Sequence, residues 1–263
     1  MKTLLAATLF LVSTQVMAAG LGSPTLGKSV IYKEKETELE GYMAETPMKK
    51  KKVPGFIIVH DWMGLSEENK QEVEKLADKG SVALAVDIYG KGVRPKNGDE
   101  AGKTAGIYKK DRALLRERIK AGYNLLLANK KVDPKKIVIL GYCFGGMTAL
   151  DLARTGADLA GVVSFHGNLD SVDPKEAKNI KAKVLVLHGA IDPYVPAAQV
   201  DAFQKEMDDA KVDYQLVKFS GAVHAFTNKN AGTDISKGAA YNATADARSR
   251  KMFDSFVAEV LAL

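Results

Sequence analysis

The amino-acid sequence predicts one α/β domain, in which helices cover both faces of a mostly parallel sheet. Short, continuously apolar runs recur along the chain and alternate with stretches of helical periodicity, the pattern of a sheet buried on both sides. No linker, composition shift or internal repeat divides residues 20–263. Of the 263 residues, 46% are hydrophobic and 27% are charged, which excludes disordered, collagen-like and coiled-coil proteins. We therefore expect residues 20–263 to form a single domain.

The expected elements follow one another in a regular order. The first is a hairpin of two short strands at residues 28–32 and 39–44. Further strands are expected at residues 56–59, 82–88, 137–140, 161–165, 184–187 and 214–219. Helices are expected between the Ser66 cap and Gly80, and at residues 112–129, 146–154, 196–210 and 243–261. Residues 89–104 are rich in Gly, Lys and Pro, so we expect a loop there that sets substrate specificity.

Residues 1–19 have the layout of a secretory signal peptide. Lys2 is the basic start, and Leu4–Val12 is an apolar stretch too short to span a bilayer. Val16-Met17-Ala18 supplies small or compact residues for cleavage near Ala18 or Ala19. The alternative is a buried N-terminal helix. We expect a mature protein that is exported, most consistent with a bacterial periplasm, with no stable membrane insertion after cleavage.

The strongest local motif is Gly141-Tyr142-Cys143-Phe144-Gly145-Gly146, which follows an apolar strand and precedes a helix. It has the pattern of a nucleophile elbow, with cysteine in place of the commoner serine. A sharp strand-to-helix turn presents the nucleophile, glycines avoid Cβ clashes, and the helix N-terminus favours a thiolate. Cys143 is the only cysteine, so it has no intramolecular disulfide partner. The alternative is a buried structural cysteine beside helix-packing glycines.

Two later residues supply the acid and the base of a catalytic triad in the chain order that the elbow requires. Asp192 follows the strand at 184–187, and His224 follows the strand at 214–219. Both loops leave the carboxyl ends of strands, where open α/β sheets build their sites. A histidine there takes the thiol proton, and the carboxylate fixes its tautomer. The alternative is that Asp192 only caps a turn before Pro193.

An oxyanion hole is expected from two backbone N–H groups. One belongs to Phe144, directly after the nucleophile, and the other to Trp62, in the His60-Asp61-Trp62-Met63-Gly64 loop after the strand at 56–59. The alternative is that Trp62 only covers the rim of the core. For His60, His166 and His188 we expect structural partners rather than direct catalysis. No metal site is expected, because no spacing such as H-E-x-x-H appears.

Together these motifs resemble the dienelactone hydrolase family. The resemblance rests on Cys143 in GYCFGG, Asp192 in GAIDPYVP, His224 in AVHAF, the HDWMG loop and the ending from Ala240 to Arg248, and it extends from about residue 28 to 260. It implies a single-domain α/β-hydrolase fold with a Cys-His-Asp triad. It also implies cleavage of lactones or esters through an acyl-thioester intermediate, with neither a metal nor an organic cofactor.

The resemblance also assigns residues around the nucleophile, and here the chain departs from the family. The family has a glutamate that interacts with the resting thiol, and Asp61 stands at that position, so Asp61 and the adjacent His60 are expected to modulate the thiol or to line the substrate site. Of the two arginines that bind a substrate carboxylate in its best-known members, one is represented by Lys91, or further on by Arg94, and the other by Asn228. A bidentate carboxylate fork is lost with them. The triad is therefore carried over, and the dienelactone substrate is not.

The sequence thus predicts an exported hydrolase, a cysteine esterase or lactonase acting on small molecules. The alternative is a non-catalytic protein of the same fold that binds a ligand or protein of the cell envelope. Thiol redox chemistry is disfavoured because a second cysteine is missing. Nucleic-acid binding is not expected, because the net charge of +6 is small for this length and no basic–aromatic patch appears.

Overall fold

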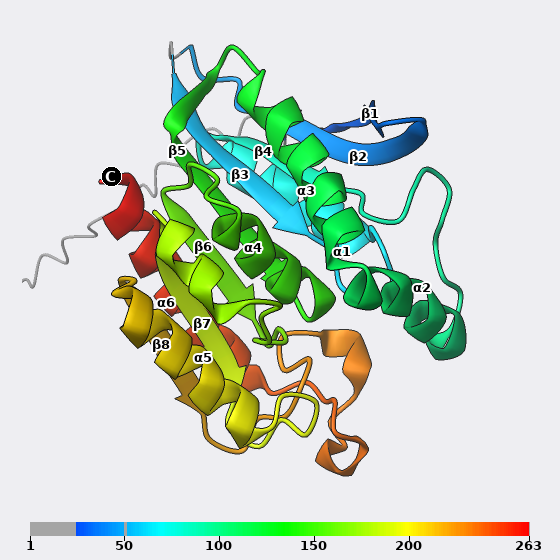
Figure 1. Ribbon diagram of the computed structural model, residues 1–263. Helices are drawn as coiled ribbons and strands as arrows, with labels where there is room; N and C mark the ends of the chain where they lie inside the picture. The colour runs from blue at the N-terminus through cyan, green and yellow to red at the C-terminus, as the bar shows by residue number, and fades with distance from the viewer. Residues whose placement is uncertain (1–24, 50–51, 263) are drawn as a thin grey trace, which may run out of the picture.

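The computed structural model describes residues 25–49 and 52–262, so the expected signal peptide lies outside the described residues. An eight-stranded sheet in the order β1-β2-β4-β3-β5-β6-β7-β8 forms its centre (Figure 1). The strands are β1 (Lys28–Glu34), β2 (Thr37–Glu45), β3 (Val53–Val59), β4 (Val82–Val86), β5 (Val132–Tyr142), β6 (Gly161–Phe165), β7 (Lys183–Gly189) and β8 (Tyr214–Phe219). Antiparallel pairing joins β1 to β2 and β2 to β4, and every other pair is parallel.

Six α-helices and three short 3-10 helices connect or follow these strands in the described part of the chain. The helices are α1 (Glu67–Asp78), α2 (Gly98–Lys110), α3 (Arg112–Leu127), α4 (Phe144–Arg154), α5 (Ala197–Ala210) and α6 (Ala243–Leu261), with η1 (Pro174–Asn179), η2 (Lys229–Ala231) and η3 (Ile235–Lys237). None of the described helices is long and apolar enough to cross a membrane.

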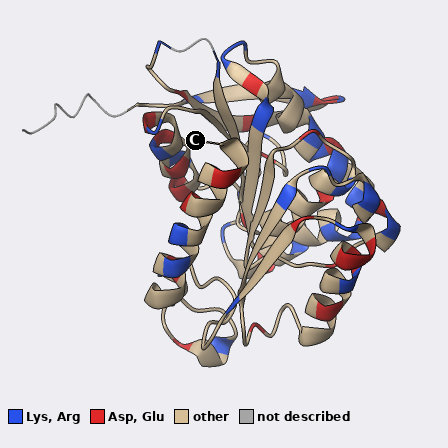
Figure 2. Cartoon of the chain, turned by 90° about the vertical axis from the view of Figure 1, so that its left-hand side faces the viewer, with Lys and Arg blue, Asp and Glu red and all other residues tan. Residues whose placement is uncertain are grey.

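The sheet is buried on both faces, as the continuous apolar strands predict. In β5, Ile137 and Ile139 pack in the layer under α3, α4 and α5, whereas Val138 and Leu140 pack in the opposite layer under α1 and α6. This alternation follows from the two-residue period of a strand. Figure 2 shows that charged residues lie mainly on the helices and loops, and that the middle of the sheet is almost free of them.

The expected fold and most of its elements are confirmed. The strands at 161–165 and 214–219 and the helix at 243–261 have the expected bounds, and β1 and β2 form the expected hairpin. The expected loop at 89–104 is wrong in its second half, because α2 begins at Gly98. The Asn97 side chain caps that helix by accepting a hydrogen bond from Glu100 N, which outweighs the glycines that suggested a loop.

The strand order changes direction beside β3. The chain moves from β3 to β4 on one side and then returns to place β5 on the other side of β3. Open α/β sheets bind their ligands outside the carboxyl ends of the strands at such a switch point. The loop after β3 and the turn after β5 therefore meet where a site is expected.

Candidate active site

Cys143 occupies a sharp turn between β5 and α4. Its backbone has φ +54° and ψ −115°, a left-handed conformation that costs a non-glycine residue strain and is typical of functional sites. A Cβ on Gly141 would overlap the backbone of Gly145, and one on Gly145 would overlap the carbonyl oxygen of Val59. Glycine is therefore required on both sides of Cys143, because the start of α4 packs directly on the ends of β3 and β5.

His224 and Asp192 are brought together by the loops that follow β8 and β7. His224 Nδ1 lies 2.8 Å from Asp192 Oδ2, and the other carboxylate oxygen accepts a hydrogen bond of 2.8 Å from the backbone N–H of Tyr194. Both side chains are buried. Because a carboxylate only accepts hydrogen bonds, Nδ1 carries a proton and donates it to Asp192. The second ring nitrogen, Nε2, is therefore the one available to interact with Cys143.

The electrostatics of His224 link it to Cys143 as well as to Asp192. Burial disfavours the charged imidazole, but the charge of Cys143 and the hydrogen bond to Asp192 outweigh it and raise the pKa of His224 to about 10. Cys143 and His224 line the same cleft. A protonated imidazole beside the sulfur is therefore favoured, which is the arrangement of an activated cysteine.

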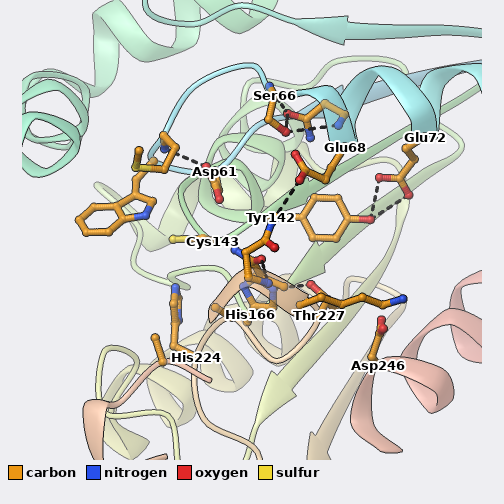
Figure 3. Close-up of a pocket in the computed structure, with 18 of the residues that line it drawn as sticks. Asp61, Ser66, Glu68, Glu72, Tyr142, Cys143, His166, His224, Thr227 and Asp246 are labelled. Carbon is orange, nitrogen blue, oxygen red and sulfur yellow. Dashed lines mark hydrogen bonds between the residues drawn. The ribbon is translucent and has the colours of Figure 1, made fainter. Parts of the chain in front are cut away.

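The loop after β3 places Asp61 and Trp62 at the same site. Figure 3 shows Asp61 and His224 on either side of Cys143. Asp61 Oδ1 accepts a 2.8 Å hydrogen bond from Met63 N, and burial raises the pKa of the Asp61 carboxyl. Trp62 is 41% exposed, and its carbonyl oxygen accepts a hydrogen bond from the Tyr89 hydroxyl.

Phe144 is the first residue of α4, with Cys143 as the N-cap residue. Helix geometry gives the first N–H groups of a helix no carbonyl within the helix to bond. The Phe144 N–H is thus a donor at the position that the elbow requires. Its side chain is fully buried and stacks on His60 with ring centroids 5.9 Å apart.

His60 lies behind the site rather than in it. Its Nε2 accepts a hydrogen bond from Ile88 N, so the proton is on Nδ1, which donates to the carbonyl oxygen of Asp61 at 2.6 Å. Burial lowers the pKa of His60 to about 4, which keeps the ring neutral. His60 therefore fixes the Asp61 loop against the end of β4, and it is not among the residues that line the cleft.

His166 and His188 are also buried near the candidate triad residues. His166 Nε2 lies 2.9 Å from the Thr227 hydroxyl, and its ring meets the edge of His224 at a centroid distance of 5.2 Å. Burial, followed by the charge of His224, holds the pKa of His166 well below its usual range. Burial also lowers the pKa of His188. Both rings are neutral packing partners of the site.

A cleft of about 1260 Å³ opens over Cys143 and His224. Asp61, Trp62 and Asn228 are among the residues that line it. Lys91 is not among its lining residues and instead pairs with Glu38 at 3.1 Å on the surface. Arg94 is likewise outside the lining, and its guanidinium donates to the carbonyl oxygens of Gly90, Val93 and Glu40.

Several lining residues were missed by the sequence reasoning. Tyr194 packs edge-on against His224, with ring centroids 5.3 Å apart. Its position in the sequence, two residues after Asp192, is the one feature that could have indicated a place in the site. Tyr142, Glu72 and Arg250 form a hydrogen-bonded group in the cleft. No sequence motif marks them as a group. Among residues 25–49 and 52–262, no three His, Cys, Asp or Glu side chains converge on a possible metal position.

The sheet topology, the strained turn at Cys143 and the chain order of Cys143, Asp192 and His224 are those of an α/β hydrolase fold. The chain belongs to the dienelactone hydrolase family, whose sequence model matches residues 39–261. It is therefore a hydrolase of that family.

The relatives agree with this assignment. The chain is 31% identical over 209 residues to protein usf of Aquifex pyrophilus, covering 78% of this chain and 88% of that one. The same identity and coverage hold for a protein of Aquifex aeolicus (strain VF5) named provisionally as a carboxymethylenebutenolidase. Among solved structures, a dienelactone hydrolase-like promiscuous phosphotriesterase from metagenomic libraries superposes with a TM-score of 0.85 at 36% identity, covering 90% of this chain and 99% of that one.

Proposed function

We propose that the protein hydrolyses small carboxylic esters or lactones, with Cys143 as nucleophile, His224 as general base and acid, and Asp192 as the residue that orients His224. The observation that carries the proposal is the 2.8 Å hydrogen bond between His224 Nδ1 and Asp192 Oδ2 in a cleft that also exposes Cys143. It leaves Nε2 of the imidazole for the proton of the thiol.

In the first half of the reaction, Cys143 Sγ, whose proton is held by His224, attacks the carbonyl carbon. The new S–C bond pushes the carbonyl π electrons onto oxygen, and the N–H groups of Phe144 and Trp62 stabilise this oxyanion. When the carbonyl re-forms, the C–O bond breaks and His224 gives its proton to the leaving oxygen. The products are an acyl-thioester on Cys143 and a free alcohol, which stays tethered to the acyl group if the substrate is a lactone.

In the second half, water replaces the alcohol. Acylation removes the charge of Cys143, which is the largest of the interactions that raise the pKa of His224. The imidazole then loses its proton more readily and takes one from the attacking water, so that the acid is released and the thiol is restored. The same histidine thereby serves both half-reactions.

The substrate class follows from the relatives and from the residues around the cleft. One relative, from Aquifex aeolicus, is named as a carboxymethylenebutenolidase. Another, from Bradyrhizobium sp and 28% identical to this chain, is named as a 2-oxo-3-(5-oxofuran-2-ylidene)propanoate lactonase. Both names support lactones as substrates. Asn228 cannot form the two-pronged contact that arginine makes with a carboxylate, and Lys91 lies outside the cleft. We therefore favour esters and lactones without an essential carboxylate.

The test is an assay of the freshly reduced mature protein against short aryl esters and small lactones. Cys143→Ala and His224→Ala should each lose several orders of magnitude in kcat/KM, with folding checked by circular dichroism. Lys91→Met, a change outside the cleft, is the control and should keep the wild-type rate. If the wild-type protein turns over none of these substrates, or Cys143→Ala keeps its rate, the proposal is wrong and a non-catalytic binding protein of the envelope becomes the better explanation.

We also propose that the chain is exported to a bacterial periplasm after cleavage near Ala18 or Ala19. The support is the arrangement of Lys2, the apolar stretch at 4–12 and the small residues before the cleavage point. Expression of the full chain in a Gram-negative host, followed by fractionation and N-terminal sequencing, tests this. Uncleaved protein in the cytoplasm would contradict it.

A further inference from the structure

The cleft continues well beyond the reacting atoms. Its volume of about 1260 Å³ exceeds the roughly 300–1,000 Å³ typical of a pocket for a drug-sized ligand, so a small lactone would leave most of it empty. The additional space runs between α1 and α6, which pack on the same face of the sheet. We call this part the α1–α6 groove and define it by Glu72, Lys75, Tyr142, Asp246 and Arg250.

The groove begins beside the nucleophile. Tyr142 precedes Cys143 directly, and Figure 3 shows that its ring points away from His224 toward Glu72, with Asp246 beyond. Glu72 accepts hydrogen bonds of 2.8 and 2.9 Å from the Tyr142 hydroxyl. A substrate bound at Cys143 therefore has a polar wall next to one of its ends.

Arg250 is held rigidly in this wall. Its guanidinium lies over the ring of Tyr142 at 5.4 Å, its Nη1 donates to Glu72 at 2.8 Å and to the Tyr142 hydroxyl at 2.7 Å, and its Nε lies 3.4 Å from Asp246. Arginine has five N–H donors, and these contacts use the one on Nε and the two on Nη1. In the described residues no acceptor pairs with Nη2, and the side chain is 41% exposed. Two oriented donors thus remain for a ligand.

The charge of the groove decides what kind of ligand fits these donors. Along α1, its C-cap and α6, five carboxylates and three cationic side chains line the cleft, an excess of two negative charges. An anionic group would meet Glu72 and Asp246 on either side of Arg250 and be repelled. A neutral group with many hydroxyls avoids this repulsion, because its oxygens accept from Nη2 while its O–H groups donate to the carboxylates.

We propose that the α1–α6 groove binds the uncharged, hydroxyl-rich alcohol portion of an ester, such as a sugar or polyol, and that Arg250 is the residue that selects it. This inference rests on the proposed function, since it names the substrate class of the same site. The loss of a carboxylate-binding arginine at Asn228 agrees with it, because both features disfavour anionic substrates.

The experiment compares three acetyl esters that differ in their alcohol: 6-O-acetyl-glucose, hexyl acetate and 4-nitrophenyl acetate. The wild-type protein should favour 6-O-acetyl-glucose over hexyl acetate at least tenfold in kcat/KM. Arg250→Met, which keeps an apolar stem over Tyr142, should abolish this preference through KM and change the 4-nitrophenyl acetate rate less than about twofold, since lost hydrogen bonds to a charged donor correspond to about tenfold or more. Arg248→Met, an exposed arginine on the same helix and outside the cleft, should change neither.

Two further measurements cover the remaining outcomes. If Arg250→Met also loses 4-nitrophenyl acetate activity, Arg250→Lys is used in its place, because lysine keeps a charge for Glu72 but lacks the second nitrogen. For the proposal to stand, Arg250→Lys must keep the 4-nitrophenyl acetate activity and lose the preference for 6-O-acetyl-glucose over hexyl acetate. Calorimetric binding of methyl glucoside, glucuronate and glucosamine to the wild-type protein separates neutral, anionic and cationic ligands.

Tightest binding of methyl glucoside, weakened by Arg250→Lys, supports the groove assignment even if no ester is hydrolysed, in which case only the proposed function fails. Ester hydrolysis with no sugar preference, or with a preference that survives both Arg250 substitutions, overturns the groove assignment and leaves the proposed function standing. Tighter binding of glucuronate or glucosamine than of methyl glucoside overturns it as well.

Discussion

Replacing Asp192 with asparagine tests the proposed mechanism most directly, because the structure specifies what the new amide would do. One carboxylate oxygen of Asp192 accepts from His224 Nδ1 and the other from Tyr194 N, both at 2.8 Å. Asparagine has a single acceptor oxygen, so it satisfies only one of these donors. If the oxygen stays with Tyr194, the amide NH2 faces Nδ1 and forces the proton onto Nε2. The imidazole then cannot take up the thiol proton, so the protonated imidazole beside the sulfur is lost.

The size of the effect follows from the pKa of His224. A rise from 6.5 to about 10 corresponds to roughly 5 kcal/mol of differential stabilisation, shared between Cys143 and Asp192. If Asp192 supplies half of it, its loss removes roughly 2.5 kcal/mol from the stabilisation of the protonated imidazole, which lowers the pH at which His224 loses its proton by about two units. The larger effect comes from the wrong tautomer, so we expect Asp192→Asn to lose about 10³- to 10⁴-fold in the rate of acylation.

The assay is the pre-steady-state burst of 4-nitrophenol from 4-nitrophenyl acetate, which reports acylation separately from deacylation. The alkaline limb of the wild-type profile should lie near pH 10, where His224 loses its proton, and Asp192→Asn should move this limb to lower pH. Urea unfolding shows whether the variant is folded. A folded Asp192→Asn protein with a burst rate within tenfold of wild type, and with the limb unmoved, would refute the assignment of Asp192.

Three other predictions follow from contacts around the site and in the core. Gly145→Ala places a Cβ against the carbonyl oxygen of Val59, so urea unfolding should show a loss of about 1–3 kcal/mol or more together with loss of activity; an unchanged midpoint would contradict the close packing at the elbow. Asp151→Ala removes a fully buried carboxylate that lies 2.6 to 3.5 Å from three arginines, and should cost about 3–5 kcal/mol by the same measurement, while Lys205→Ala, in an exposed pair, should leave the midpoint unchanged. Asn228→Arg adds a two-pronged donor to the cleft and should raise kcat/KM for carboxylate-bearing lactones about tenfold over their methyl esters; equal effects on both substrates would be contrary evidence.

Most of the fold and the grouping of the candidate triad were predictable because they depend on local rules. Continuous apolar strands require helices on both faces, and the carboxyl ends of parallel strands share one edge. Residues after β5, β7 and β8 must therefore meet, and Cys143, Asp192 and His224 do lie together. The position of Lys91 was less predictable, since it lies where the chain leaves β4 and its side chain turns to Glu38 on the surface rather than to the cleft.

The α1–α6 groove shows why the remainder required the structure. The two-residue period of β5 puts Tyr142 on the side of α1 and α6, where Val138 and Leu140 also pack, so the direction of its ring was contained in the sequence pattern. Its partners were not, because Glu72 and Arg250 are 178 positions apart and each reads as an ordinary charged residue on the polar side of a helix. Only the packing of α1 beside α6 turns them into one site. Tyr142 is the last residue of β5, and the candidate nucleophile Cys143 follows it directly in the turn to α4, so a specificity site at the Tyr142 side chain begins next to the residue proposed to react.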